Sequence, residues 1–289
     1  MVSTACENWK DLLKDGDFPC SPAAVDAYAY TPLAEQFSRV FLSMRISDLP
    51  GNPTVREAWG EGSWIEMAYR ILAGSFDPET GERAIDTMII MAPKKSAKSC
   101  VAALAQLTLM LITKRPGSNF PILAPTLEVA NLSFRMSADA VTLSPEVDAI
   151  VKSQDHLKRL TNLRTNSTLR VIPASPKSAT GMRSHVTLVD EIHTLAASSA
   201  DADRTWAQIV GAGAADPGAA TVIITTMSER PPTGIWRELL NRARDVRDGK
   251  REEPNLLPIL FEPWPDADLE DREVWAWPPM GSGSDLSAL

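Results

Sequence analysis

The chain has 289 residues, of which 44% are hydrophobic and 23% are charged, and its formal net charge is −8. This composition is typical of a globular protein and excludes a protein coated in positive charge, although it allows a local basic channel. The three cysteines, Cys6, Cys20 and Cys100, have no metal-ligand spacing, so we expect reduced thiols rather than a metal site or a disulfide framework.

The apolar segments of the chain do not indicate a membrane protein. The first residues, MVSTACENWKDLLKDGD, contain no apolar core, so we expect no signal peptide. The longest apolar run, from Val101 to Thr113, is shorter than the roughly 20 residues that a membrane helix needs. We therefore expect no membrane among the partners of this chain.

Residues 1–85 show helical periodicity. In the stretch 32–46, Leu33, Phe37 and Phe41 fall on one face of a helix, and a similar pattern recurs between residues 56 and 76. The polar cluster DPETGER at residues 77–83 is typical of a turn. We predict an N-terminal helical region over residues 1–85.

After residue 85 the pattern changes to short β-type apolar runs, which are Thr87–Met91, Phe120–Ala124, Leu169–Ile172, Val186–Val189 and Thr221–Thr225. Helical patterns lie between several of them, at Ser99–Thr113, Leu127–Leu143 and Arg204–Val210. Apolar strands that alternate with helices predict a mostly parallel sheet with both faces covered, and ligands of such sheets bind at the carboxyl ends of the strands. We place this core at residues 86–230, and a helical lid and linker at residues 231–289.

The first strand ends in concentrated positive charge. Residues Ala92 to Ser99, APKKSAKS, match the phosphate-binding pattern G-x-x-x-x-G-K-[ST] with alanine in both glycine positions. Lys98 would contact the β- and γ-phosphates of ATP, and the Ser99 hydroxyl would bind Mg²⁺. The candidate phosphate-binding residues are Pro93, Lys94, Lys95, Ser96, Ala97, Lys98 and Ser99. Taken alone, a solvated basic turn is an equally simple interpretation.

The strand VTLVD ends in adjacent acids. Asp190 at the tip could hold Mg²⁺, and Glu191 could orient and deprotonate an attacking water. The alternative is a helix N-terminus that carries acidic residues for favourable dipole interactions. A further strand ends in Thr225 and Thr226, whose hydroxyls could sense the γ-phosphate, although such a pair is uninformative alone.

In this order, the three strand ends favour a nucleotide hydrolase. The predicted fold class is α/β: a P-loop NTPase of the ASCE or RecA-like type, with a mostly parallel sheet flanked by helices and an N-terminal helical segment. His193 either caps and packs without a function or couples the acidic strand to bound nucleic acid.

The stretch from His156 to Val189 contains no acidic residue. It carries Lys158, Arg159, Arg164, Arg170, Lys177 and Arg183. In a chain of negative net charge this segment favours contact with a phosphate backbone, to which Asn162, Asn166 and Ser167 could add hydrogen bonds. A solvated surface is the alternative interpretation.

These motifs resemble, in order, those of the ATPase domain of tailed-phage terminase large subunits, the DNA-packaging motors. The resemblance rests on five segments, which are Ala92–Ser99, Ile122–Val141, Ser178–Leu195, Ile223–Ser228 and, more loosely, Val274–Gly283. It implies that Lys98 and Ser99 bind phosphate and Mg²⁺, that Asp190 binds the metal and that Glu191 is the catalytic base. It also implies that Thr225 and Thr226 couple hydrolysis to movement.

The resemblance has departures as well. Lys94 stands where the family usually has arginine, and lysine cannot form a bidentate contact. Ala97 replaces the glycine before the catalytic lysine. Ring ATPases of this type take an arginine from the neighbouring subunit, and Arg183 is the candidate for that trans contact. Gln36 is the candidate for the adenine pocket in the N-terminal region.

The resemblance further implies double-stranded DNA, a portal protein and a terminase small subunit as partners, a homo-oligomeric ring when assembled, and a location in the host cytoplasm. Full large subunits carry a C-terminal nuclease, and we expect no nuclease activity from this chain. Two other functions stay open: a DExH helicase-like fragment, because DEIH fits that motif, and a catalytically degenerate P-loop module that only binds partners.

Overall fold

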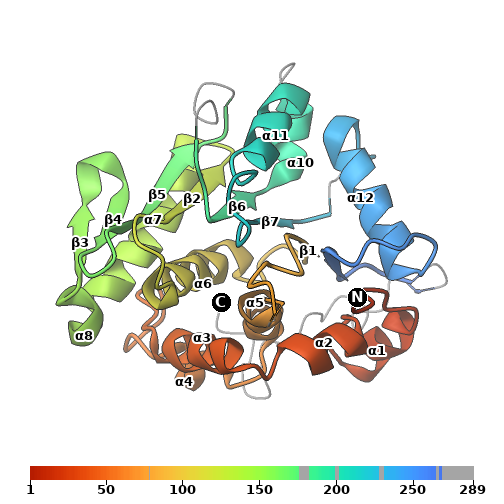
Figure 1. Ribbon diagram of the computed structural model, residues 1–289, viewed down its shortest axis with the longest axis horizontal. Coiled ribbons are helices and arrows are strands. Elements are labelled where there is room, and N and C mark those ends of the chain that lie inside the picture. Colours follow the sequence, from red (N-terminus) through yellow and green to blue (C-terminus); the bar gives the residue numbers. More distant parts are fainter. Residues whose placement is uncertain (78, 176–181, 199–201, 228–230, 265–266, 269–289) are drawn as a thin grey trace.

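The structure is a computed structural model, and it describes residues 1–77, 79–175, 182–198, 202–227, 231–264 and 267–268. Within these residues eight strands form one sheet in the order β3-β4-β5-β2-β6-β7-β1-β8. The six strands from β8 to β5 are all parallel to their neighbours, whereas β4 and β3 extend the sheet in antiparallel fashion. The predicted class, a mostly parallel α/β sheet flanked by helices, is confirmed (Figure 1).

The parallel strands lie close to the apolar runs of the sequence. They are β1 (Thr87–Met91), β2 (Asn119–Ala124), β5 (Ser167–Pro173), β6 (Val186–Asp190), β7 (Ala220–Thr225) and β8 (Leu256–Leu260). The antiparallel pair is β3 (Val151–Gln154) and β4 (Arg159–Asn162), joined by the short 3-10 helix η1 (Asp155–Leu157). Sequence patterns identified neither this pair nor β8.

Alternate residues of the central strands face two separate hydrophobic cores. In β1, Met88 and Ile90 face the core on one side of the sheet, and Ile89 and Met91 face the other core. Because both faces are covered, every residue from Met88 to Met91 is buried, which explains the continuous apolar run in the sequence.

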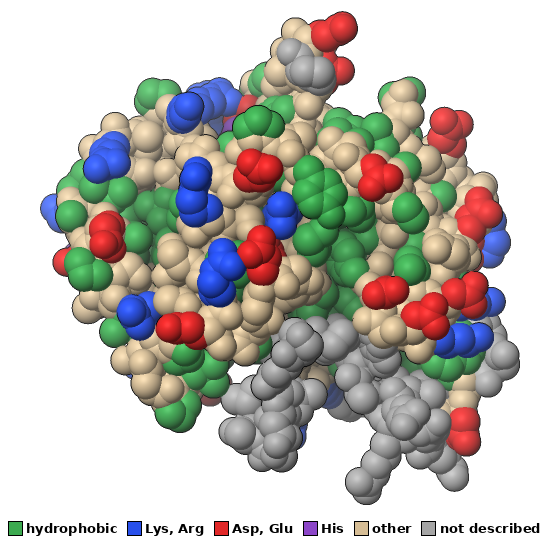
Figure 2. Space-filling model, turned by 90° about the horizontal axis from the view of Figure 1, so that it is seen from below, with side chains coloured by type: hydrophobic (Ala, Val, Ile, Leu, Met, Phe, Trp, Pro, Cys, Tyr) green, Lys and Arg blue, Asp and Glu red, His purple; other side chains and the backbone are tan. Residues whose placement is uncertain are grey.

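The first core lies under α6 (Lys98–Ile112), α7 (Leu127–Thr142) and the N-terminal helices (Figure 1). These N-terminal helices are α1 (Trp9–Asp15), α2 (Pro22–Tyr28), α3 (Pro32–Ser43), α4 (Val55–Trp59) and α5 (Trp64–Gly74). The short α8 (Pro145–Asp148) follows α7. Viewed from the side of the N-terminal helices, the surface carries basic and acidic side chains interspersed, without one dominant sign (Figure 2).

The second core is covered by α10 (Ile192–Ser198), α11 (Ala202–Gly211) and α12 (Gly234–Arg247). Trp236 on α12 is the largest of its fully buried side chains. Helix α12 leads directly into β8, which pairs with β1. Residues 234–260, which sequence analysis left outside the core, therefore contribute a covering helix and a strand to the central sheet.

No helix among the described residues is both long enough and apolar enough to cross a membrane.

Candidate active site

The loop between β1 and α6 places Lys98 at the first turn of a buried helix. Its turn needs left-handed backbone at two positions, Lys95 with φ 66° and Ala97 with φ 50°. Of the two alanines in the motif, only Ala97 takes this conformation, in which an L-residue is strained and glycine is not. The Ser96 hydroxyl donates to the Pro93 carbonyl at 2.8 Å and closes the loop.

Helix α6 begins with no side chain capping its N-terminus. Its first backbone N–H groups therefore lack intrahelical partners and, together with the helix dipole, favour an anion at this position. Lys98 adds a full positive charge here, and its side chain is only 8% exposed. The loop, the helix start and Lys98 thus form a potential phosphate cradle.

The acidic tip of β6 lies directly against this loop. The Lys98 Nζ is 2.9 Å from Glu191 Oε1, and the Ser99 hydroxyl donates to Asp190 Oδ1 at 3.1 Å. Segments separated by about 90 residues along the chain therefore meet at the carboxyl edge of the sheet. The structure brings together Lys98, Ser99, Asp190 and Glu191, as the motifs predict.

The second oxygen of Glu191 is held by the end of β7. Glu191 Oε2 accepts from the Thr226 backbone N–H at 3.2 Å and its hydroxyl at 3.3 Å, and from the Thr225 hydroxyl at 3.4 Å. His193 Nδ1 lies 3.1 Å from the same oxygen and 2.8 Å from the Thr225 hydroxyl oxygen. Thr225 and Thr226 thus contact the acid directly, and His193 links the acid to Thr225.

Glu191 is held in a strained backbone conformation, with φ 52°. Such outliers persist where surrounding contacts fix them, and they concentrate at functional sites. Burial acts to raise the pKa of Glu191, but the hydrogen bond with His193 and the charge of Lys98 outweigh it and lower the pKa to about 2. Glu191 is therefore an anion at neutral pH.

Asp190 has the opposite electrostatics. Its burial, and secondly the negative charge of Glu191, raise its pKa to about 6. Its Oδ2 is buried and has no hydrogen-bond partner within the described residues. A desolvated carboxylate beside a serine hydroxyl suits Mg²⁺, which usually takes only one or two protein ligands beside phosphate oxygens and water.

No protein-family profile matches the chain, and no curated protein matches its sequence. Among solved structures, the large terminase of bacteriophage HK97 superposes with a TM-score of 0.68 and 19% identity, over 86% of this chain and 48% of that chain. The chain has the fold of the HK97 large terminase. It spans about half the length of that protein.

Two more terminase structures superpose over smaller shares of the chain. The Thermus phage P74-26 ATPase domain gives a TM-score of 0.41 at 19% identity, over 52% of this chain and 63% of that one. The large terminase of a thermophilic bacteriophage, in complex with ADP, gives 0.36 at 12% identity, over 49% and 33%. The HK97 match alone shows the terminase fold, since it extends beyond the strands of the sheet to most of the chain.

Within this terminase fold, Arg183 does not reach the site of its own chain. It lies before β6, at the end of that strand opposite Asp190, and its side chain is exposed. Any contact of Arg183 with nucleotide phosphates would therefore have to be made on a neighbouring subunit. Lys94 and Lys95 are exposed on the phosphate loop, and Pro93 is half-buried beside them.

The suggestion that Gln36 lines the adenine pocket is wrong. Gln36 lines a cavity of about 720 Å³ together with Leu109 and Ile112, at the carboxyl end of α6. Lys98 begins α6, and a helix of this length spans roughly 20 Å. Gln36 is therefore remote from the phosphate loop.

The basic segment of the sequence is not one surface. Arg159 and Arg170 are paired across β4 and β5, whereas Arg164 lies in the turn at the far end of these strands. Asn162 and Ser167 are buried, and Asn162 Oδ1 accepts from the Arg164 backbone N–H at 3.0 Å, so both serve the turn. Lys177 and the motif at Val274–Gly283 lie outside the described residues.

One residue near the site escaped sequence analysis. Tyr69 on α5 is fully buried, its hydroxyl has no partner within the described residues, and its pKa is raised by burial and secondly by the charge of Asp190. A tyrosine within an apolar helix gives no signal that could have identified it.

Proposed function

We propose that this chain is the ATPase motor part of a terminase large subunit, which hydrolyses ATP with Mg²⁺ to move double-stranded DNA into a procapsid. The observation that carries the proposal is the convergence of Lys98, Ser99, Asp190 and Glu191 at one sheet edge. A chain of the HK97 terminase fold supports the motor rather than a helicase, which would need a second RecA-like domain.

The phosphates of ATP would lie at the start of α6, in contact with Lys98 and the backbone N–H groups of the loop. Ser99 and Asp190 would hold Mg²⁺, since their oxygens lie 3.1 Å apart and Asp190 keeps a second, unpartnered oxygen. When bound, the metal would neutralise charge on the transferring phosphoryl group.

Glu191 would accept a proton from the attacking water. In the structure it is a poor base because Lys98 and His193 stabilise its anion. Phosphates that draw Lys98 away would remove one of these contacts and raise the basicity of Glu191. Thr225, Thr226 and His193 would keep the carboxylate in place and pass its movement to β7.

The remaining assignments rest on the shared fold. They comprise a portal protein and a terminase small subunit as partners, a homo-oligomeric ring, the host cytoplasm as location and no nuclease activity in this chain. We also propose a helical region at residues 1–85, an ATPase core at residues 86–230 and a lid and linker beyond it, with α12 and β8 completing the sheet.

Phosphate release from ATP by the purified chain, with and without Mg²⁺ and duplex DNA, tests the proposal. Turnover should need Mg²⁺ and should be lost in Glu191→Gln. Equal background rates for the wild type and this variant would favour the degenerate binding module. DNA-stimulated turnover with strand separation of a duplex would favour the helicase.

A further inference from the structure

The amino edge of the sheet, opposite the phosphate loop, gathers basic residues from three segments. Lys114 and Arg115 follow α6, Arg164 lies in the turn between β4 and β5, and Arg183 precedes β6. Backbone contacts join these segments, because the Gly117 N–H donates to the Thr165 carbonyl at 2.9 Å. We call Lys114, Arg115, Arg164 and Arg183 the amino-edge patch.

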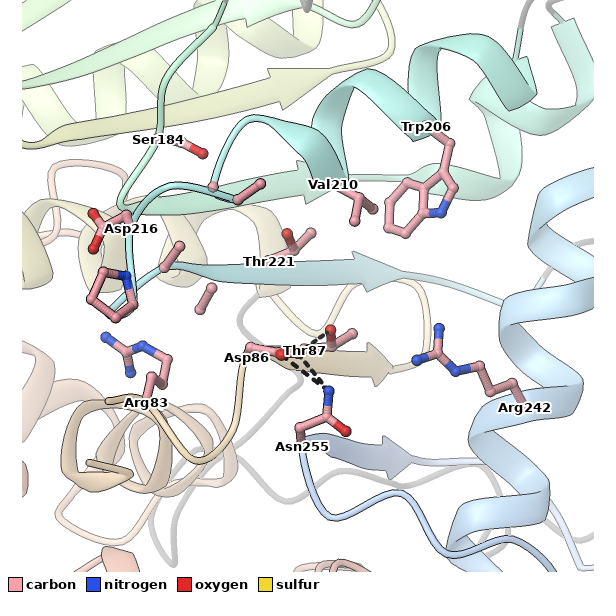
Figure 3. Close-up of a pocket in the computed structure, with 15 residues that line it drawn as sticks. Arg83, Asp86, Thr87, Ser184, Trp206, Val210, Asp216, Thr221, Arg242 and Asn255 are labelled. Carbon is pink, nitrogen blue, oxygen red and sulfur yellow. Dashed lines mark hydrogen bonds between the residues drawn. The ribbon is translucent and has the colours of Figure 1, made fainter. Parts of the chain in front are cut away.

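Arg115 and Arg183 line one cavity of about 350 Å³, with Ser118 and Asn119 from the same loop. Asp216 is the acid on this cavity wall, and it is already engaged. It accepts from the Gly218 N–H at 2.9 Å, contacts His185 Nδ1 at 2.9 Å and forms an ion pair with Arg115. The neighbouring cavity, of about 490 Å³, shows Asp216 and Ser184 beside the starts of the central strands (Figure 3).

The other three cations of the patch have no such partner. Within the part of the chain that the structure describes, no salt bridge engages Lys114, Arg164 or Arg183, and all three side chains are exposed. Three unpaired cations beside an acid that is already neutralised make a local excess of positive charge, although the chain carries −8.

We propose that the amino-edge patch binds the phosphate backbone of a nucleic-acid duplex, with one phosphate held between Arg115 and Arg183. The proposal deepens the proposed function, on which it rests for the identity of the duplex as DNA. Exposed cations on separate loops suit the repeated charges of a polyanion, whereas a single nucleotide needs donors that converge on one point. Arg183 is then a DNA contact rather than a trans contact to ATP.

A second basic surface provides a matched control. Lys152 on β3 and Arg170 on β5 are exposed on the antiparallel end of the sheet. The charged neighbours there are partly engaged: Gln154 holds Arg159 at 2.6 and 2.9 Å, and the Lys158 amine lies 5.1 Å from the centre of the Phe134 ring. No described cavity opens between Lys152 and Arg170.

Fluorescence anisotropy of a labelled DNA duplex, without nucleotide and over a salt titration, tests the patch. The variant Arg164→Gln/Arg183→Gln should weaken binding about tenfold or more. It should also reduce the slope of log affinity against log salt by about 2, since each lost phosphate contact removes roughly 0.9. Lys152→Gln/Arg170→Gln, which changes the net charge equally, should leave the slope within about 0.5 of the wild type.

Three outcomes would overturn the proposal. They are a wild type with no salt-dependent duplex binding, an equal loss in the control variant, and equally tight binding of polyglutamate. Loss of concentration-dependent ATP turnover without DNA in Arg183→Gln, with duplex binding intact, would instead assign Arg183 to a neighbouring ATP site. A chain that binds the duplex through this patch but hydrolyses nothing would refute the motor and leave the patch standing.

Discussion

The two edges of the sheet differ in how they hold charge. At the carboxyl edge, Lys98 and Asp190 are buried, and the charges are paired or desolvated within a few ångströms of each other. At the amino edge, Lys114, Arg164 and Arg183 are exposed around open cavities. Strained backbone occurs at Ala97 and Glu191 on the first edge.

This difference indicates two kinds of ligand. Buried charges are costly unless a partner compensates them, so an edge built from them selects a small ligand that brings its own charges in a fixed geometry. Exposed cations interact weakly and are screened by salt, and they suit a long anion that contacts several of them at once. ATP with Mg²⁺ fits the first edge, and a phosphate backbone fits the second.

The largest effect should come from Glu191→Gln, which retains the size of the side chain and removes its charge. Loss of a general base should lower the turnover of ATP about 10²- to 10⁴-fold. Binding of a fluorescent ATP analogue should persist or tighten, because Lys98 is then released from its ion pair. Turnover within about threefold of the wild type would remove Glu191 from catalysis and, with it, the functional contrast between the two edges.

Asp190→Asn should separate stability from activity at the carboxyl edge. The rise in the pKa of Asp190 from 3.8 to about 6 means that its anion costs the folded state about 3 kcal/mol at neutral pH. Asparagine keeps an oxygen for the Ser99 hydroxyl without this cost, so the free energy of unfolding should increase by about 2 kcal/mol while Mg²⁺-dependent turnover is lost.

The pH dependence of that gain follows from the same shift. Above pH 6 the wild type carries the buried anion, and the full difference in unfolding free energy between variant and wild type should be present. Below pH 4, Asp190 is protonated in both the folded and the unfolded state, so the difference should vanish. Urea unfolding between pH 4 and pH 8 measures it, and a variant less stable than the wild type at pH 8 would contradict the assigned desolvation.

Sequence patterns identified the interior of the sheet better than its margins. Strands β1, β2, β6 and β7 have neighbours on both sides and helices on both faces, and such strands give continuous apolar runs. Strand β8 contains Pro258, which argues against a strand, but β8 lies at the sheet edge, where one side needs no backbone donor. Strands β3 and β4 are four residues each and mostly polar, too short for a periodic signal.

The candidate site divides in the same way. Lys98, Ser99, Asp190 and Glu191 follow strands in recognisable motifs, and parallel strands necessarily bring such ends to one edge. The amino-edge patch has no motif, because its residues come together through a backbone contact between two loops. Reversal of the chain at β4 separates Arg164 from Arg159, so a basic run in the sequence became two surfaces.

His193→Ala should have an intermediate effect on the carboxyl edge. The imidazole contacts both Glu191 Oε2 and the Thr225 hydroxyl, so its loss should leave the acid less well fixed and less acidic. We expect turnover to fall about tenfold, which corresponds to about 1.4 kcal/mol, with nucleotide affinity unchanged. His193→Gln, which can restore one hydrogen bond, should recover part of the rate. A change in affinity with an unchanged rate would place His193 in binding instead.

Ala97→Gly should have the smallest effect, and it tests whether the carboxyl edge stores strain. The left-handed conformation costs an L-residue about 1–2 kcal/mol, whereas glycine adopts it freely but loses about 0.4–1 kcal/mol through the greater entropy of its unfolded chain. The free energy of unfolding should therefore increase, by about 1 kcal/mol at most. Ala138→Gly in the middle of α7 provides the matched control and should lose about 1 kcal/mol, because a helix interior favours alanine. Equal destabilisation by both substitutions in urea unfolding would show that the loop is unstrained, and that its departure from the glycine pattern has no energetic consequence for the phosphate cradle.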